Sequence, residues 1–199
     1  INGEKMSKSL GNFFTIREVL EKYHPEVVRY LLIASHYRSP INYSEDSLRE
    51  AKTALERFYN ALKGLPEAEP AAADEFVARF AAAMDDDFNT AGACSVLFEL
   101  AREVNRLRDT DLAAAAALAA RLKALAGLLG VLQLEPEAFL RGDAAGRVDA
   151  AAVEALIEAR LAARAAKDWA ASDQIRDQLS AMGVLLEDAK GVTSWRLAD

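Results

Sequence analysis

Residues 5–17 of this 199-residue chain read KMSKSLGNFFTIR, and the predicted helices begin at the end of this stretch. Two lysines and two serines fall within its first five positions, with Gly3 before them and Gly11 after them. Glycine lets a loop move or approach a ligand closely, and lysine is a compact charge suited to phosphate oxygens. The pattern predicts a loop whose lysines, hydroxyls and N–H groups hold phosphate and stabilise a leaving pyrophosphate.

A solvated loop is the plainer interpretation of two lysines and two serines close together. This stretch and several later ones, however, resemble the sequences of a known protein family. The first five residues resemble the KMSKS motif of class I aminoacyl-tRNA synthetases, and the continuation to Arg17 is similar to cysteinyl-tRNA synthetases in particular. Blocks similar to that family recur at residues 36–40 (HYRSP), 84–90 (MDDDFNT) and 167–171 (KDWAA). Because several blocks occur in the right order, the chain is identified as a member of that family.

The resemblance implies substrates and a role for the loop. In that family the loop closes over ATP, and the second lysine contacts the ATP phosphates while cysteine is activated to cysteinyl-adenylate. The implied catalytic and ATP-binding residues are Lys5, Met6, Ser7, Lys8 and Ser9, with Lys8 as the second lysine. ATP with magnesium, L-cysteine and tRNA-Cys are the implied substrates and partners. The family's catalytic zinc belongs N-terminal to this loop, so its ligands are expected outside this chain.

Bulk composition limits the alternatives. The chain is 52% hydrophobic, much of it alanine and leucine, which favours helices. No run approaches the ~20 apolar residues of a membrane span, no signal peptide is visible, and the start at Ile1 suggests a piece of a longer polypeptide. A single cysteine, Cys94, excludes an internal disulfide, and with only two histidines it cannot assemble a usual Cys/His zinc site. We expect a cytoplasmic monomer without a metal site in this chain.

Net charge argues against one simple form of nucleic-acid binding. The formal charge is −7 and the pI is about 5.0, so bulk electrostatic coating of RNA is disfavoured. Recognition of RNA must rest on local patches and on shape.

Apolar periodicity predicts a run of helices over the first two thirds of the chain. Thr15 is expected to cap a helix reaching Tyr23, Pro25 to begin the next, and Ser44 to cap a long amphipathic one. Further helices are predicted before residues 85–87, after Asn89 or Thr90, and from 111 to 130 with leucines 118, 122, 125, 128 and 129 inward. Long helices with short breaks indicate an antiparallel bundle.

Three polar features of this region allow more than one interpretation. The aspartates at 85–87 suit turn formation and capping better than a divalent-metal site, because adjacent side chains diverge. Arg38 is expected to pair with a carboxylate, with tRNA contact as the alternative, while His24 and His36 fit helix ends. The arginines at 102, 106 and 108 form a solvated face or, less simply, a basic strip for the tRNA backbone.

The last third of the chain has a different pattern. Residues 135–147 lack periodicity and are predicted to be a linker. Two helices follow: one from Asp149, with an apolar stripe of Val153, Leu156, Ile157 and Leu161, and one over about 168–182. Residues 184–195 predict a hairpin. The expected fold is therefore mainly α: a helical bundle followed by a small α+β domain. The predicted divisions are 1–22 (loop and end of the catalytic domain), 23–134 (bundle), 135–147 (linker) and 148–199 (anticodon-binding domain).

The second helix of this domain has a polar face with one aromatic side chain. At 100° per residue, Ile175, Leu179 and Met182 share the core side, whereas Trp169 and Asp173 lie opposite. An exposed tryptophan beside a carboxylate suits stacking on an unpaired base, although it could equally cover a helix end or a domain contact. Trp195 is expected to fix the hairpin to the helices.

Resemblance to the family's anticodon-binding domain assigns roles to four residues of this unit. The implied anticodon-contacting residues are Arg164, Trp169, Asp173 and Asp188. The tryptophan would stack on the first anticodon base, and the two aspartates would accept from the N–H groups of guanine.

Three hypotheses follow. The first is the C-terminal part of a cysteine–tRNA ligase, inactive alone because the nucleotide fold and zinc ligands are missing. The second is a related ligase that joins cysteine to an amino-sugar, whose similarity would end with the bundle. The third, a helical interaction module without catalysis, conflicts with the succession of matching blocks.

Overall fold

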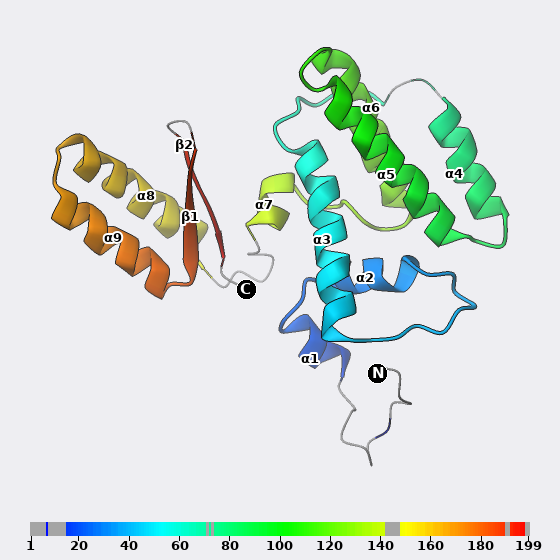
Figure 1. The fold of residues 1–199 in the computed structure, drawn as a ribbon, viewed down its shortest axis with the longest axis horizontal. Coiled ribbons are helices and arrows are strands. Elements are labelled where there is room, and N and C mark those ends of the chain that lie inside the picture. The colour runs from blue at the N-terminus through cyan, green and yellow to red at the C-terminus, as the bar shows by residue number, and fades with distance from the viewer. Residues whose placement is uncertain are drawn as a thin grey trace. The chain divides into compact units, whose positions relative to one another are not determined.

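The computed structural model describes residues 7, 15–70, 72, 74–141, 148–189 and 192–197, with the side chains of 189 and 192 outside the description. The chain forms two compact units, Ile1–Pro136 and Glu137–Asp199. The described residues are mostly helical, with a small antiparallel hairpin near the C-terminus (Figure 1). This confirms the predicted mainly α class.

The first unit is built from helices that begin at side-chain caps. The helices are α1 Ile16–Leu20, α2 Pro25–Ile33, α3 Glu45–Leu62, α4 Glu75–Asp85, α5 Thr90–Leu107 and α6 Leu112–Leu128. Thr15 and Ser44 cap α1 and α3, as the sequence predicts, and Asn89, one of the two residues expected there, caps α5. The side-chain oxygens of all three accept from backbone N–H groups of the first turn. Helix α1 ends earlier than expected, since residues 21–23 form a turn instead of a last helical turn.

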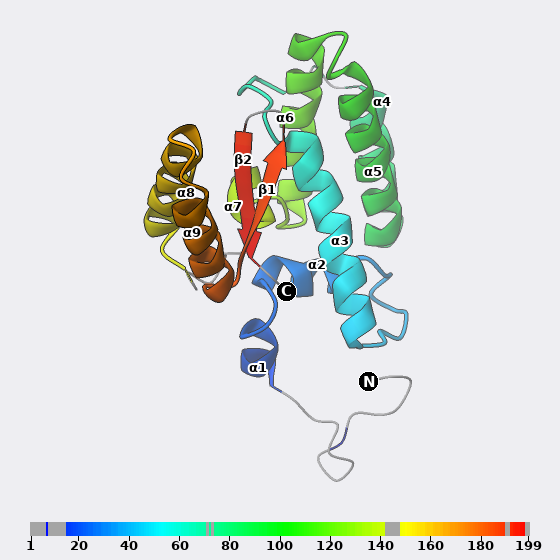
Figure 2. The same cartoon turned by 60° about the vertical axis from the view of Figure 1, so that its left-hand side comes forward.

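The core of this unit lies where α3, α5 and α6 turn their apolar faces inward. Helix α5 packs between α4 and α6, and α3 packs against α2 and α5 (Figures 1 and 2). The largest fully buried side chains include Leu48, Leu55, Phe58, Tyr59, Leu97, Leu100 and Leu122. Phe58 stacks on Phe98 with ring centroids 4.3 Å apart.

The inward face of α6 differs from the prediction. Leu122 and Leu125 are buried, but Leu128 is 74% exposed, and the rest of the buried face consists of alanines. The helix is apolar nearly all round, so its sequence carries little periodic signal. The small alanine side chains allow α6 to approach α5 closely, which explains why they occupy the interface.

A buried carboxylate ties three separate segments of the first unit together. Glu26, near the start of α2, accepts from the Tyr59 hydroxyl at 2.6 Å and from the backbone N–H groups of Leu132 and, at 3.3 Å, Gln133. The Tyr59 oxygen also accepts from the N–H of Leu134 at 3.3 Å. Charge-assisted bonds of this kind offset the cost of burying the carboxylate. The network therefore fixes the segment after α6 against α2 and α3.

The second unit packs two helices against one face of a hairpin. Its elements are α7 Pro136–Leu140, α8 Ala150–Ala165, α9 Trp169–Ala181, β1 Val184–Ala189 and β2 Val192–Leu197. Helix α7 lies within the segment predicted as a linker, where Pro136 at the first helical position and Glu137 in the first turn favour a helix start. Its five residues are too few for a periodic pattern.

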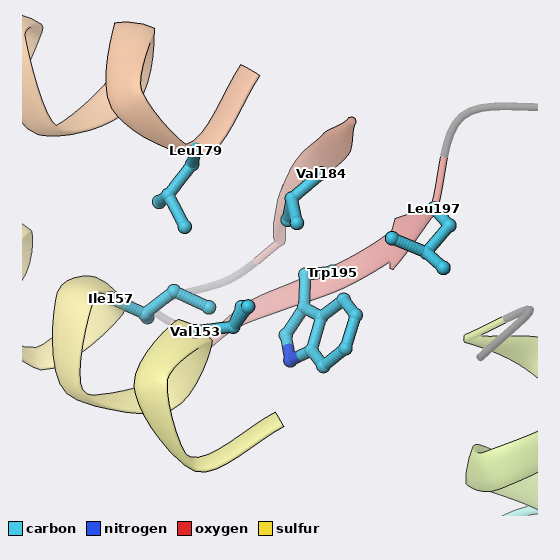
Figure 3. Packing of buried hydrophobic residues seen from close by; sticks show 6 residues of the cluster. All are labelled: Val153, Ile157, Leu179, Val184, Trp195 and Leu197. Carbon is cyan, nitrogen blue, oxygen red and sulfur yellow. The ribbon is translucent and has the colours of Figure 1, made fainter. Parts of the chain in front are cut away.

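The core of the second unit is small and centred on one indole ring. Its buried members are Val153, Ile157, Leu179, Val184, Trp195 and Leu197 (Figure 3). The Trp195 Nε1–H donates to Glu154 on α8 at 3.0 Å. This confirms the expectation that Trp195 fixes the hairpin to the helices.

The register of the hairpin determines which side chains share the core face. Val184 lies opposite Leu197, Leu186 opposite Trp195, and Asp188 opposite Thr193. Since side chains alternate along a strand, Asp188 and Thr193 are on the same face as the core pairs. The core face of this hairpin therefore ends in a carboxylate and a hydroxyl.

Candidate nucleic-acid interface

The predicted phosphate-binding loop is largely outside the described residues. Lys5, Met6, Lys8 and Ser9 lie there, whereas Ser7 is described and is partly exposed. The helix after the loop, α1, begins with a capping box in which Thr15 and Glu18 bond each other's backbone N–H. The ATP-contacting role of these residues stays a prediction.

Trp169 and Asp173 lie on the outer face of α9. Asp168 caps this helix by accepting from the N–H of Ala171 at 3.0 Å, which makes Trp169 the first helical residue. Its side chain is 60% exposed. Asp173, one turn later, is also exposed and lies 3.4 Å from Arg176. An exposed aromatic ring one turn from a carboxylate can stack on a base and accept from its edge.

Arg164 and Asp188 come together although 24 residues separate them. The Arg164 Nη1 of α8 lies 3.3 Å from the Asp188 Oδ2 of β1. The same carboxylate accepts from Arg160 through both Nη atoms, at 3.3 and 3.1 Å, and from the Thr193 hydroxyl at 2.6 Å. Hydrogen bonds from Arg160 and Thr193, with the charges of both arginines, lower the pKa of Asp188 to about 2. The carboxylate is therefore ionised at neutral pH.

Arg160 is the residue of this cluster that the sequence pattern missed. The prediction placed Leu161 on the inward stripe of α8, but Leu161 is exposed and Arg160 is buried. Positions 153, 157 and 160 follow the i, i+4, i+7 spacing of one helix face. That spacing was the available signal, and it was overlooked because arginine is seldom buried without a partner.

Two of the sequence blocks that resemble the family, residues 36–40 and 84–90, meet at Asp87. Its carboxylate accepts from the Tyr37 hydroxyl at 2.8 Å and pairs with the Arg38 Nε at 2.9 Å, while its carbonyl lies 3.1 Å from the His36 Nε2. Asp87 and Phe88 both have positive φ angles, of 53° and 52°. The predicted turn formation at the aspartates is confirmed at residues 86–88, after α4 ends at Asp85, and so is the carboxylate partner of Arg38. Among the described residues, no group of His, Cys, Asp and Glu could hold a metal.

Arg108 fits neither the solvated face expected for the arginines of this segment nor the alternative of a basic strip. Arg108 donates to the carbonyls of Ala61 and Lys63, both at 2.7 Å, and so satisfies the end of α3. Arg106 pairs with Glu103 at 2.6 Å. Arg108 therefore serves the bundle, whereas Arg106 forms an exposed ion pair within α5.

Three family models match consecutive parts of the chain. A model described as tRNA synthetases class I (C) catalytic domain matches residues 1–53, a DALR domain model matches 79–133, and a cysteinyl-tRNA ligase anticodon binding domain model matches 150–196. The third match contains Arg164, Trp169, Asp173 and Asp188.

Curated relatives match this chain over all 199 of its residues. They include cysteine–tRNA ligases of Pseudomonas aeruginosa at 85% identity, Stutzerimonas stutzeri at 81% and Pseudomonas syringae at 76%. The chain spans 43% of the length of these relatives. The ordered family matches and the high identity show that this chain belongs to the cysteinyl-tRNA synthetase family.

Proposed function

We propose that this chain is part of a cysteine–tRNA ligase that activates L-cysteine with ATP and transfers it to tRNA-Cys. Residues 1–22 would supply the loop that contacts ATP, and residues 23–134 would form the bundle that supports tRNA. Residues 135–147 would connect the bundle to residues 148–199, which would bind the anticodon. Arg164, Trp169, Asp173 and Asp188 are the proposed anticodon contacts.

The observation that carries the proposal is the outer face of α9. Trp169 is exposed although tryptophan is a large apolar side chain, and Asp173 lies on the same face one turn away. Stacking of a base on an aromatic side chain contributes about 1–3 kcal/mol, and a carboxylate accepts from the adjacent N1–H and amino groups of guanine. The face therefore combines affinity for any base with selectivity for guanine.

The acidic balance of the chain is compatible with this role. Carboxylates repel phosphate, but they discriminate among bases through the donors on each base edge. A net charge of −7 therefore disfavours non-specific RNA binding while leaving base readout intact. We expect specific complexes of modest affinity.

The chemical step of the proposal rests on the loop. Lys8 would contact the phosphates of ATP, with Lys5, Met6, Ser7 and Ser9 shaping the loop, and the match of residues 1–53 to a catalytic-domain model supports this assignment. Magnesium would accompany ATP, and zinc would be held elsewhere in the intact enzyme. A cytoplasmic monomer is part of the same proposal; within the described residues, no helix is long and apolar enough to cross a bilayer.

A ligase that joins cysteine to an amino-sugar is the alternative. Such an enzyme needs no anticodon reader, so the match of residues 150–196 to an anticodon-binding model favours the tRNA ligase. Charging assays on the intact enzyme, with tRNA-Cys or an amino-sugar as acceptor, separate the two.

Binding to tRNA-Cys tests the proposal. At fixed low salt, Trp169→Ala should weaken binding by about fivefold or more, the lower end of a lost stacking contact. Leu185→Ala is a matched control, because Leu185 is an exposed apolar side chain of the same unit. Equal affinities of wild type and Trp169→Ala would remove Trp169 from the interface.

A further inference from the structure

Arg160 is held differently from the other charged residues around Asp188. Its side chain is only 10% exposed, and both Nη atoms bond the Asp188 carboxylate. Its buried Nε has no hydrogen-bond partner among the described residues. A buried guanidinium requires its counter-ion, since removing one partner leaves an unpaired charge in a dry environment. The Arg160–Asp188 contact is therefore a fixed part of the unit.

The Asp188 carboxylate has no acceptor position left over. An ionised carboxylate offers about four lone-pair sites. Oδ1 accepts from Arg160 and from Thr193, and Oδ2 accepts from Arg160 and from Arg164. An N–H of a base can bond this carboxylate only if one of these donors leaves.

Arg164 is the donor that can leave most easily. Its side chain is 44% exposed, and it contacts Asp188 through one nitrogen at 3.3 Å. Exposed ion pairs of this type contribute little, because water screens the charges and solvates the guanidinium when it is released. Arg160 is buried and bonded twice, and Thr193 is the cross-strand neighbour of Asp188.

We infer that Arg160 is the positioning residue of the anticodon face: it fixes the Asp188 carboxylate, and Arg164 occupies the acceptor position on Oδ2 that an N–H of guanine takes on binding. The inference rests on the proposed function. Arg160 itself touches no base in this account, and its effect passes through Asp188. Release of Arg164 leaves its guanidinium available for the RNA backbone.

The anchoring role can be tested without RNA by following the Asp188 carboxyl carbon in NMR titrations of the full chain. Arg160→Lys should raise the pKa of this carboxyl clearly more than Arg164→Lys does, because lysine cannot donate to both oxygens at once. Arg196→Lys is the matched control, since Arg196 pairs with Glu187 on the other face of the hairpin. An equal or larger shift in Arg164→Lys would overturn the inference.

The recognition role is tested with anticodon stem–loop RNAs that carry guanine or adenine at the first anticodon position. Adenine lacks both the N1–H and the exocyclic 2-amine of guanine, so it removes either donor that could bond Asp188. Arg160→Lys should reduce the preference for guanine by about tenfold, the scale of one lost charge-assisted hydrogen bond, with the tryptophan fluorescence of the free chain unchanged. Arg164→Ala should lower the affinity for both RNAs but keep the preference.

The outcomes separate this inference from the proposed function. Loss of guanine preference in Arg164→Ala, with retention in Arg160→Lys, would overturn the inference while leaving anticodon recognition intact. A wild-type chain that binds neither RNA would contradict the proposed function. In that case the carboxyl titration still decides whether Arg160 or Arg164 is the anchor.

Discussion

Glu26 and Asp188 each collect several donors from segments distant in the sequence. Glu26 accepts from Tyr59 and from the backbone after α6, and Asp188 accepts from two arginines and Thr193. Helical spacing places Arg160 on the inward face of α8, but the contacts within either cluster could not be read from the sequence. The partners of a buried charge are set by packing between elements, which a pattern along one element does not contain.

At the residue scale, Tyr59→Phe should destabilise the first unit by about 1–3 kcal/mol, because the change leaves Glu26 and the Leu134 N–H each without one partner in the interior. Urea unfolding followed by far-UV circular dichroism gives the free energy. Tyr23→Phe is the control, since Tyr23 bonds the exposed Glu45 and should change stability by about 0.5 kcal/mol or less. Equal effects would argue against the buried network.

Asp188 makes the second unit sensitive to acid. Its pKa is about 2 in the folded protein and 3.8 in the absence of these contacts, so the unfolded chain takes up the proton first. The stabilisation is complete above about pH 4 and is lost as the pH falls toward 2. Asp188→Asn should lower the free energy of unfolding at pH 7 and reduce its further fall between about pH 4 and pH 2. Tryptophan fluorescence during urea unfolding at several pH values measures this free energy. An unchanged fall at acid pH would contradict the lowered pKa of Asp188.

Helix ends are the elements that the sequence predicted best. Caps at Thr15, Ser44 and Asn89 follow from local hydrogen bonding, which needs no knowledge of the rest of the fold. The stripe of α6 and the short α7 were not predicted, because an all-apolar helix has no polar face and five residues have no period. The polar face of α9 was predicted, since its core residues recur at helical spacing.

Two glycines at helix ends give a prediction at this scale. Gly64 and Gly130 both have positive φ, of 73° and 72°, and alanine there should cost about 1–2 kcal/mol. A Cβ at Gly130 would also collide with the Arg29 guanidinium, whereas nothing lies within 4 Å of one at Gly64. The nearest contacting atom is the far end of the exposed Arg29 side chain, which can swing aside, so Gly130→Ala should be at most slightly more destabilising than Gly64→Ala in urea unfolding. A much larger effect at Gly130 would show that the Arg29 guanidinium is held firmly in place.

At the scale of the whole molecule, each unit contains residues whose signal reports on the unfolding of that unit alone. Both tryptophans lie in the second unit, and the single cysteine, Cys94, is buried in the first. Burial raises the pKa of the Cys94 thiol to about 11. At pH 8, a thiol reagent should label Cys94 only on unfolding, while tryptophan fluorescence follows the second unit. Rapid labelling of the native chain would contradict the packing of α5.

The family of the chain was predictable from its sequence. Motif blocks in the sequence identified the family, and the family matches agree with them. The side-chain arrangement around Asp188 was not predictable, since Arg160 enters it from a core position. Sequence named the residues proposed to contact RNA, and only the structure reveals what holds one of them in place.

The most direct test of the central claim is the affinity of the full chain for two anticodon stem–loop RNAs of tRNA-Cys at one low salt concentration. The RNAs differ only at the first anticodon base, guanine or adenine. The account predicts that the guanine RNA binds at least about tenfold more tightly, because adenine cannot supply the same donors to Asp173 and Asp188. Equal affinities for the two RNAs would contradict it.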